Sequence, residues 1–326
     1  SRRKPLVVAG YSLSGVSKCV MAFASSWPWL LGLRFGDRVG KAMRNPPRDA
    51  LLADASDPGA LGRTFGLHRA MDTLGAAIGP LVAWWLLTHW AERGAAAYRH
   101  IFFVSAIPAA IAVFVLVVFV RPAPARPKPA AGAAAPGALG PFFARFVATD
   151  VLFQLGNSSN AFLLLRASRM GFDAGGVALV YLAFNLVAAL LALPLGGLAD
   201  RVGRRPLLLA GYLVYALAYA IAAFVPSMAG VVVAFMVLAV HTALVEGQAK
   251  SLVADLVPRE RRASAYGIYH AAVGCALLPA SLVAGLLWER VGPAAPFALG
   301  AAFAVAAAIA FATLLPSARE SSERHA

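Results

Sequence analysis

Charged residues are scarce in this chain, since only 13% of its 326 residues are Asp, Glu, Lys or Arg. Soluble domains carry about 25% charged residues. This chain is instead 60% hydrophobic, with a mean hydropathy of +0.72. Such a composition excludes a water-soluble domain of this length, and we expect an integral membrane protein that crosses the bilayer several times.

Cysteine and recognisable catalytic motifs are equally rare. Cys19 and Cys275 both lie in apolar segments, where an extracellular disulfide is not expected, so we interpret them as packing residues. The sequence has no Walker A loop, dinucleotide-binding glycine pattern, zinc-ligand spacing or nucleophile elbow. We therefore expect no enzyme activity, no metal and no cofactor, and an ion gradient is left as the energy source.

Acidic residues number 15 against 29 basic ones, which gives a formal charge of +14. The basic residues cluster at alternate junctions between apolar segments, chiefly at 2–4, 121–128, 201–205 and 259–262. Short cytoplasmic loops carry such an excess of Lys and Arg. Orientation in a lipid bilayer therefore explains the charge, and no nucleic-acid partner is expected.

Ten apolar segments are long enough to cross a membrane. They cover about 5–26, 28–54, 63–89, 99–120, 142–166, 172–198, 205–226, 228–256, 263–288 and 294–315. The stretch 121–141 is rich in Pro, Ala and Gly and is predicted to be a cytoplasmic linker. It divides the chain into a helical domain at 1–120 and another at 142–326.

The turn between the sixth and seventh segments reads G-x-L-A-D-R-x-G-R-R, from Gly196 to Arg205. It resembles the signature loop of the major facilitator superfamily of secondary transporters. The resemblance implies two six-helix bundles, alternating access and a gating role for this loop, with Asp200 capping a helix and Asp255 paired with Arg201. The residues it assigns to gating are Gly196, Asp200, Arg201, Gly203, Arg204 and Asp255.

A second copy of the pattern relates the two halves of the chain. Pro5 aligns with Pro206, an offset of 201 residues (206 minus 5), and the same offset places Asp54 on Asp255. Parallel repeats of this kind put a substrate site near the bilayer midplane. We expect an all-α membrane protein of two pseudo-symmetric six-helix bundles, the first lacking two helices in this chain. About 60 further residues, room for two spans, are then expected before Ser1.

The segment 28–54 carries basic residues at steps of three and four, which place them on one helical face. A cation at the bilayer centre costs about 2.5–3.5 kcal/mol, so this face is predicted to line a wet cavity. The aligned positions of the second repeat are uncharged, which favours a substrate site over the alternative, a structural salt-bridge network. The candidate substrate-binding residues are Arg34, Asp37, Arg38, Lys41 and Arg48.

Small residues predict close helix packing in two segments. One strip consists of Gly32, Gly36 and Gly40. The other, Gly75, Gly79 and Pro80, resembles part of the family's antiporter motif, with ordinary packing and a Pro kink as the alternative. Pro46 and Pro47 are predicted to break the hydrogen bonding of their helix.

A polar stripe in the fifth segment consists of Asp150, Gln154 and Asn157. It is predicted to line the cavity, with helix pairing as the alternative, and His241 is a further substrate-binding candidate. Carboxyl groups in apolar spans are the candidates for proton coupling. These are Asp37, Asp72, Asp150 and Glu246, where Asp72 could instead pair with Arg69 or His68. We interpret His270 as a packing histidine.

These features predict a proton-coupled exporter of a small anionic or zwitterionic solute. A broad-specificity drug exporter is one alternative. A transporter-like scaffold or receptor that does not translocate is another. We expect a monomer in the bacterial inner membrane.

Overall fold

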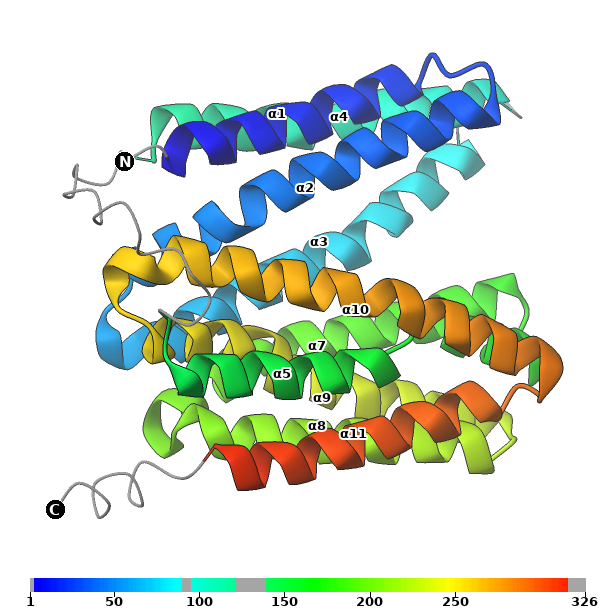
Figure 1. Cartoon of the computed structure of the whole chain (residues 1–326). Coiled ribbons are helices and arrows are strands. Elements are labelled where there is room, and N and C mark those ends of the chain that lie inside the picture. The colour runs from blue at the N-terminus through cyan, green and yellow to red at the C-terminus, as the bar shows by residue number, and fades with distance from the viewer. Residues whose placement is uncertain (1–2, 90–94, 121–138, 316–326) are drawn as a thin grey trace, which may run out of the picture. The chain divides into compact units, whose positions relative to one another are not determined.

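The computed structural model describes residues 3–89, 95–120 and 139–315, and every regular element in them is a helix (Figure 1). The elements are α1 (Arg3–Met21), α2 (Trp27–Ala55), η1 (Pro58–Ala60), α3 (Leu61–His89), α4 (Ala95–Val118), α5 (Pro141–Gly156), α6 (Ala161–Arg169), α7 (Ala174–Val202), α8 (Arg204–Phe224), α9 (Met228–Leu256), η3 (Arg259–Arg261), α10 (Arg262–Arg290) and α11 (Ala295–Leu314). The all-helical class predicted from the sequence is confirmed.

Within those described ranges, six helices are long and apolar enough to cross a membrane. They lie at Ile101–Val118, Gly175–Val202, Arg204–Phe224, Met228–Leu256, Arg259–Arg290 and Ala295–Leu314. Charged residues recur along α2, which lowers its hydropathy although its 29 residues are long enough to span.

The fifth predicted span, 142–166, is wrong as a single helix. The helix stops at Gly156 and restarts at Ala161, leaving Asn157 to Asn160 outside α5 and α6. Asn and Ser side chains compete with the helical backbone for hydrogen bonds. Here the Asn157 amide donates to the Gln154 side chain at 2.8 Å. The apolar residues on both sides hid this break.

The predicted break at Pro46 and Pro47 interrupts the hydrogen bonding of the helix but does not end it. Both prolines lie inside α2, which continues to Ala55. Proline removes a donor from the helical ladder, yet neighbouring turns keep the helix continuous.

The chain divides into two compact units, each described by itself. The first unit holds the described parts of 1–55, 78–133 and 262–270, and the second holds those of 56–77, 134–261 and 271–326. Each unit therefore combines segments from both sequence repeats. The domain boundaries at 1–120 and 142–326 stay predictions, and most of the predicted linker, 121–138, lies outside the described residues.

In the first unit α1 packs against α2 and α4. The backbones of α1 and α2 cross where Gly10 faces Gly40, since a Cβ added at Gly10 would lie 2.6 Å from the Gly40 carbonyl oxygen. Only glycine allows so close an approach at this crossing.

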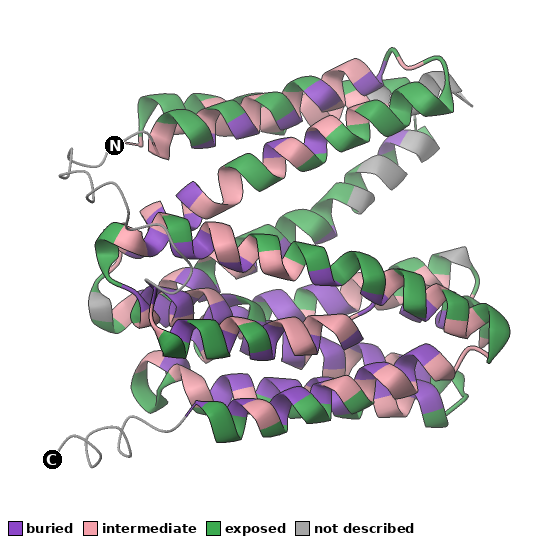
Figure 2. Ribbon diagram, in the orientation of Figure 1, coloured by how far each residue is buried: buried purple, intermediate pink, exposed green. Residues whose placement is uncertain are grey.

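The second unit is built around α8 and α9, which pack on each other, while α7 packs on α9 and α11 on α8. Buried residues, purple in Figure 2, recur along both helices. Phe153 of α5 stacks on Tyr212 of α8, and Tyr212 meets Phe311 of α11 edge to face. These rings fix α5 in the interior of this unit.

Candidate functional site

The basic face of α2 is accessible in the first unit. Arg34 and Arg38 are exposed, and the Lys41 side chain keeps 39% of its exposed area. The Nζ atom of Lys41 lies 3.6 Å from the Asp37 carboxylate. A pairing of Asp37 with one of the cations three or four residues away is expected from helical spacing. Arg34 and Arg38 leave an excess of positive charge on this face.

Asp37 itself is buried, with 8% of its side chain exposed. Its Oδ1 atom has no hydrogen-bond partner among the described residues. A buried carboxylate oxygen is costly without a donor, so this group suits a bound cationic group or a proton.

Arg48 does not belong with the accessible cations, which corrects its assignment to substrate binding. Its Nε and Nη2 atoms both donate to Oδ1 of the adjacent Asp49 at 3.0 Å. Asp49 is fully buried, and its Oδ2 lies 2.8 Å from Nε2 of His270. His270 is therefore more than the packing residue we expected, and sequence reasoning missed this three-residue cluster.

The polar stripe of α5 faces the interior of the second unit, which corrects its assignment to a solute cavity. Tyr212 donates to Asp150 at 2.9 Å, and Asp150 has no exposed area. Tyr215 donates to the Gly156 carbonyl at 3.2 Å and to Asn157 at 3.3 Å. Helix pairing, the alternative interpretation, explains Asp150 and Asn157, whereas Gln154 stays half-buried.

A signal for this network was present in the sequence. Tyr212, Tyr215 and Tyr219 recur at steps of three and four on α8, so they share one face. All three are buried, and Tyr219 donates to the Ser158 carbonyl at 3.4 Å. A row of hydroxyl donors of this kind predicts a polar partner helix.

His241 is likewise a core residue, which corrects its assignment to substrate binding. It is 5% exposed, its Nδ1 lies 2.9 Å from the Gly211 carbonyl oxygen, and its ring contacts Phe153 and Tyr215. By the 201-residue register His241 aligns with Gly40, so it fills the helix crossing that glycine keeps open in the first unit.

The signature turn binds the start of α3. Asp200 accepts hydrogen bonds from the backbone N–H groups of Gly62 at 2.7 Å and Arg63 at 2.8 Å. A carboxylate there satisfies donors that the first helical turn leaves open, so the expected capping role is confirmed. Gly203, at φ +90°, makes the turn from α7 into α8.

Arg204 links this cap to the end of α9. It lies 3.2 Å from Asp200 and also pairs with Asp255. The predicted partner of Asp255 was Arg201, which instead is exposed. Arg201 and Arg63 line a pocket of about 750 Å³ that includes Asp200.

Gly196 lies where α3 and α7 cross. A Cβ added at Gly196 would overlap the carbonyl oxygen of Gly62, and one at Gly66 would overlap that of Ala192. The turn and the crossing together hold α3 against α7 within the second unit.

The same arrangement recurs in the first unit at the aligned positions. Arg3 pairs with Asp54 at 2.6 Å, and these residues align with Arg204 and Asp255. Arg262 adds hydrogen bonds to Asp54 at 3.2 Å and to the Ala53 carbonyl at 2.9 Å. The repeat register is therefore visible in side-chain contacts.

The proton-coupling candidates Glu246 and Asp72 meet at one arginine. Arg69 of α3 pairs with Glu246 of α9 and lies 3.8 Å from Asp72. The side chain of Glu246 is 44% exposed and that of Asp72 is 62% exposed, so water reaches both carboxyl groups.

The predicted packing glycines divide into two groups. Gly36 and Gly40 contact α1, where added Cβ atoms would lie 3.0 Å and 2.7 Å from the hydroxyls of Ser17 and Ser14. Cβ atoms added at Gly32, Gly75 or Gly79 would meet no described atom within 4 Å, so their packing role is wrong for the described part of the chain. The side chain of Pro80 lies outside the described residues.

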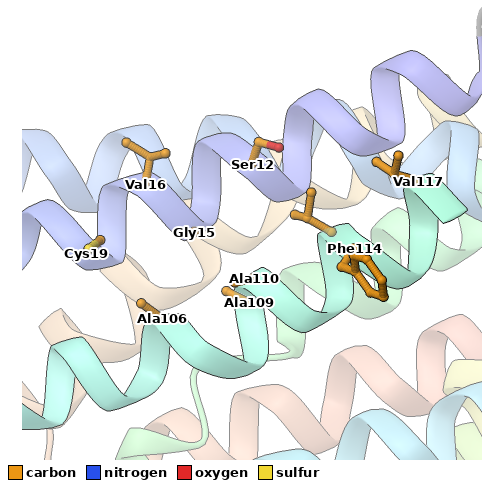
Figure 3. A pocket seen from close by; sticks show the side chains of 10 residues that line it. Ser12, Gly15, Val16, Cys19, Ala106, Ala109, Ala110, Phe114 and Val117 are labelled. Carbon is orange, nitrogen blue, oxygen red and sulfur yellow. The ribbon is translucent and has the colours of Figure 1, made fainter.

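A groove of about 530 Å³ runs between α1 and α4 (Figure 3). Ser12, Cys19, Ala109 and Phe114 are among the residues that line it, and the lining is almost wholly apolar. It offers no charged group to a polar solute, unlike the face of α2.

Comparisons with known proteins show the family and the fold of the chain. The model of the Major Facilitator Superfamily matches residues 1–167 and 146–326. An uncharacterised transporter of this type from Methanocaldococcus jannaschii, MJ1317, is 30% identical over 310 residues, covering 93% of this chain and 76% of the relative.

A shorter match and a solved structure complete the comparison. The multidrug resistance protein MdtH of Proteus mirabilis is 32% identical over 113 residues, 32% of this chain and 28% of that protein. A variant of the Escherichia coli fucose:proton symporter FucP has the same fold, with a TM-score of 0.76 at 13% identity, covering 97% of this chain and 84% of the symporter.

Proposed function

The chain belongs to the Major Facilitator Superfamily, a family of membrane transporters, and from this premise we propose that it is a proton-coupled exporter of a small anionic or zwitterionic solute. It is a multi-pass membrane protein and not an enzyme. Its prokaryotic relatives support placing it in a bacterial inner membrane, where we propose that it acts as a monomer.

The accessible cations of α2 carry this proposal. Arg34 and Arg38 are exposed on a helix that lies within a membrane protein, and Lys41 is only partly offset by Asp37. Cations in a bilayer are stable only against water, protein or a counter-charge. A carboxylate or phosphate of the solute supplies that counter-charge.

Proton coupling is assigned to one buried carboxyl, Asp37, and two accessible ones, Glu246 and Asp72. Asp37 lies beside the proposed solute, while Glu246 and Asp72 share Arg69. Protonating one of these carboxyls releases its basic partner, which changes the charge that the site offers a solute. Export follows from the resemblance of Gly75 to Pro80 to the antiporter motif.

Flux into proteoliposomes tests the proposal. Anionic solutes should move under an imposed pH gradient and stop moving when the gradient is collapsed. Binding without gradient-dependent flux would contradict transport and favour a transporter-like scaffold or receptor.

The variants Arg38→Gln and Lys41→Gln test the solute class. Each should weaken anion binding by about 10- to 100-fold, the scale of one lost hydrogen bond to a charged group, and leave neutral solutes unaffected. Arg34→Gln should act in the same direction. Wild-type affinity for every anion in both variants would show that the cluster is structural.

A broad-specificity drug exporter is the second candidate, supported by the partial match to MdtH. Under this alternative, bulky hydrophobic cations would be exported and the α2 variants would not discriminate by charge. Competition between an anion and a cationic dye for the same flux separates the two candidates.

A further inference from the structure

We infer that the cluster of His270, Asp49 and Arg48 is a proton-binding site that joins α2 to α10. The inference rests on the proposed function, since it identifies one place where the coupling proton binds. It lies in the first unit, and none of its three residues is among the carboxyls proposed above for proton coupling.

The geometry leaves one position for the proton. Each oxygen of Asp49 faces one basic group: Oδ1 receives Arg48 at 3.0 Å, and Oδ2 lies 2.8 Å from Nε2 of His270. A neutral His270 that donates from Nε2 holds its lone pair on Nδ1. A proton from water adds there and turns the ring into a cation, so the cluster changes from net charge zero to +1.

Water reaches one member of the pair, His270, and the other member, Asp49, is held inside the protein. The Asp49 side chain has no exposed area, whereas that of His270 keeps 24%. Asp49 is therefore fixed in the protein, and His270 is the member of the pair that water reaches.

The second unit contains a contact comparable to that of His270 with Asp49, but its basic member is an arginine. By the register, α2 corresponds to α9 and α3 to α10, and His270 aligns with Arg69. Arg69 pairs with Glu246 of α9, as His270 pairs with Asp49 of α2. One contact joins α2 of the first repeat to α10 of the second. The other joins α9 of the second repeat to α3 of the first, so the two contacts involve corresponding pairs of helices. One uses an arginine, which is always charged, and the other a histidine, which is a cation only when it is protonated.

Charged and titratable groups of α2 and α10 lie near His270 in the described part of the chain. From α2 they are Asp49 and Arg48, and Arg48 also hydrogen-bonds Tyr11 of α1. On α10 the rings of Tyr266 and Tyr269 lie 6.4 Å and 5.5 Å from that of His270. Asp49 is thus the anion in direct contact with His270.

The sign of the pH effect follows. A proton on His270 adds Coulomb attraction to Asp49, so the α2–α10 contact is favoured at low pH. The added attraction is lost as pH rises through the range in which histidine titrates. The Arg69–Glu246 contact gains nothing from a proton on its basic member.

Pulsed electron paramagnetic resonance tests this directly. Spin labels are placed on exposed positions of the two helices, Met43→Cys and Ser264→Cys, after Cys19→Ser and Cys275→Ser. Between pH 8 and pH 5.5 the population at the short α2–α10 distance should rise by about fivefold or more, within the usual range of coupling between sites.

Two variants and a control make the result specific. His270→Gln, which keeps a neutral donor, should show no rise. His270→Arg, whose charge does not depend on pH in this range, should hold the short distance from pH 8 to pH 5.5. His89→Gln, another histidine, should respond like the wild type. A wild type without a pH response, or a His270→Gln variant that retains it, would overturn the inference.

The same samples keep the two proposals apart. A His270-dependent distance change in a protein that moves no solute would support this site and contradict the transport function. Gradient-driven flux together with an α2–α10 distance that does not change with pH would support the transport function and contradict this site.

Discussion

The carboxylate of Asp150 lies in the closed interior of the second unit, where Tyr212 donates to it at 2.9 Å. Phe153 stacks on the same tyrosine ring. A charged group in this position is stabilised by protein donors and not by water or solute. Individual residues of the same type thus take different roles, since buried Asp37 lies 3.6 Å from the Lys41 ammonium whereas Asp150 accepts from a tyrosine hydroxyl.

The variant Tyr212→Phe should lower the free energy of unfolding by about 1.5–3 kcal/mol, because a buried carboxylate loses a hydrogen bond. Thermal unfolding in detergent measures the effect. Tyr181→Phe is the control, since the Tyr181 ring stacks on Phe184 and would keep that contact. Equal stability of the two variants would show that the Asp150 contact contributes little.

Sequence reasoning succeeded for residues whose partners are close in the chain and failed for distant ones. Lys41 lies four residues from Asp37, so helical spacing makes it one of the possible partners, beside Arg34 and Arg38. His270 lies 221 residues from Asp49, and only the fold brings them together. The register did align His270 with Arg69, but the pairing of Arg69 with Glu246 was itself not known from the sequence.

At the scale of elements, glycine decides which helices approach closely. α3 crosses α7 where Gly66 meets the backbone of Ala192, whereas Gly75, further along α3, meets no described atom. The sequence showed both glycines in apolar surroundings and gave no means to tell them apart. Apolar runs located the helices well because hydrophobicity is a local property, but the contacts between helices depend on distant residues.

The substitution Gly66→Ala should separate α3 from α7, because its Cβ would overlap a backbone oxygen that cannot rotate away. We expect a lower melting temperature and reduced flux. Gly75→Ala is the matched control for the melting temperature alone, where it should be neutral, or stabilising by about 0.5–1 kcal/mol through the loss of glycine's flexibility in a helix. If both variants have the melting temperature of the wild type, close contact between α3 and α7 does not contribute to stability.

At the scale of the whole molecule, the repeat register relates contacts in both units. Arg3 with Asp54 and Arg204 with Asp255 are the same pair of positions in the two repeats. Each unit contains segments of both repeats. Contacts between the repeats, such as Asp200 with Gly62 and Arg262 with Asp54, must break and re-form if the repeats alternate between two arrangements.

Asp200→Asn should slow transport while leaving solute affinity within a few-fold. The two oxygens of Asp200 accept from Gly62 and Arg63, and an asparagine has a single oxygen to offer. The cap therefore loses one bond and its charge, which shifts the balance between global states. A large loss of affinity with normal turnover would instead place Asp200 in the solute site.

The division of the fifth span has a consequence for biogenesis. At 16 residues α5 is about 24 Å long, shorter than the roughly 30 Å of the hydrocarbon core. The carbonyls of Gly156, the last residue of α5, and of Ser158, just beyond it, accept hydrogen bonds from Tyr215 and Tyr219, which the ribosome adds about 60 residues later. Stable insertion of α5 therefore waits for α8, and α8 variants that lack these tyrosines would first be seen as degradation during synthesis.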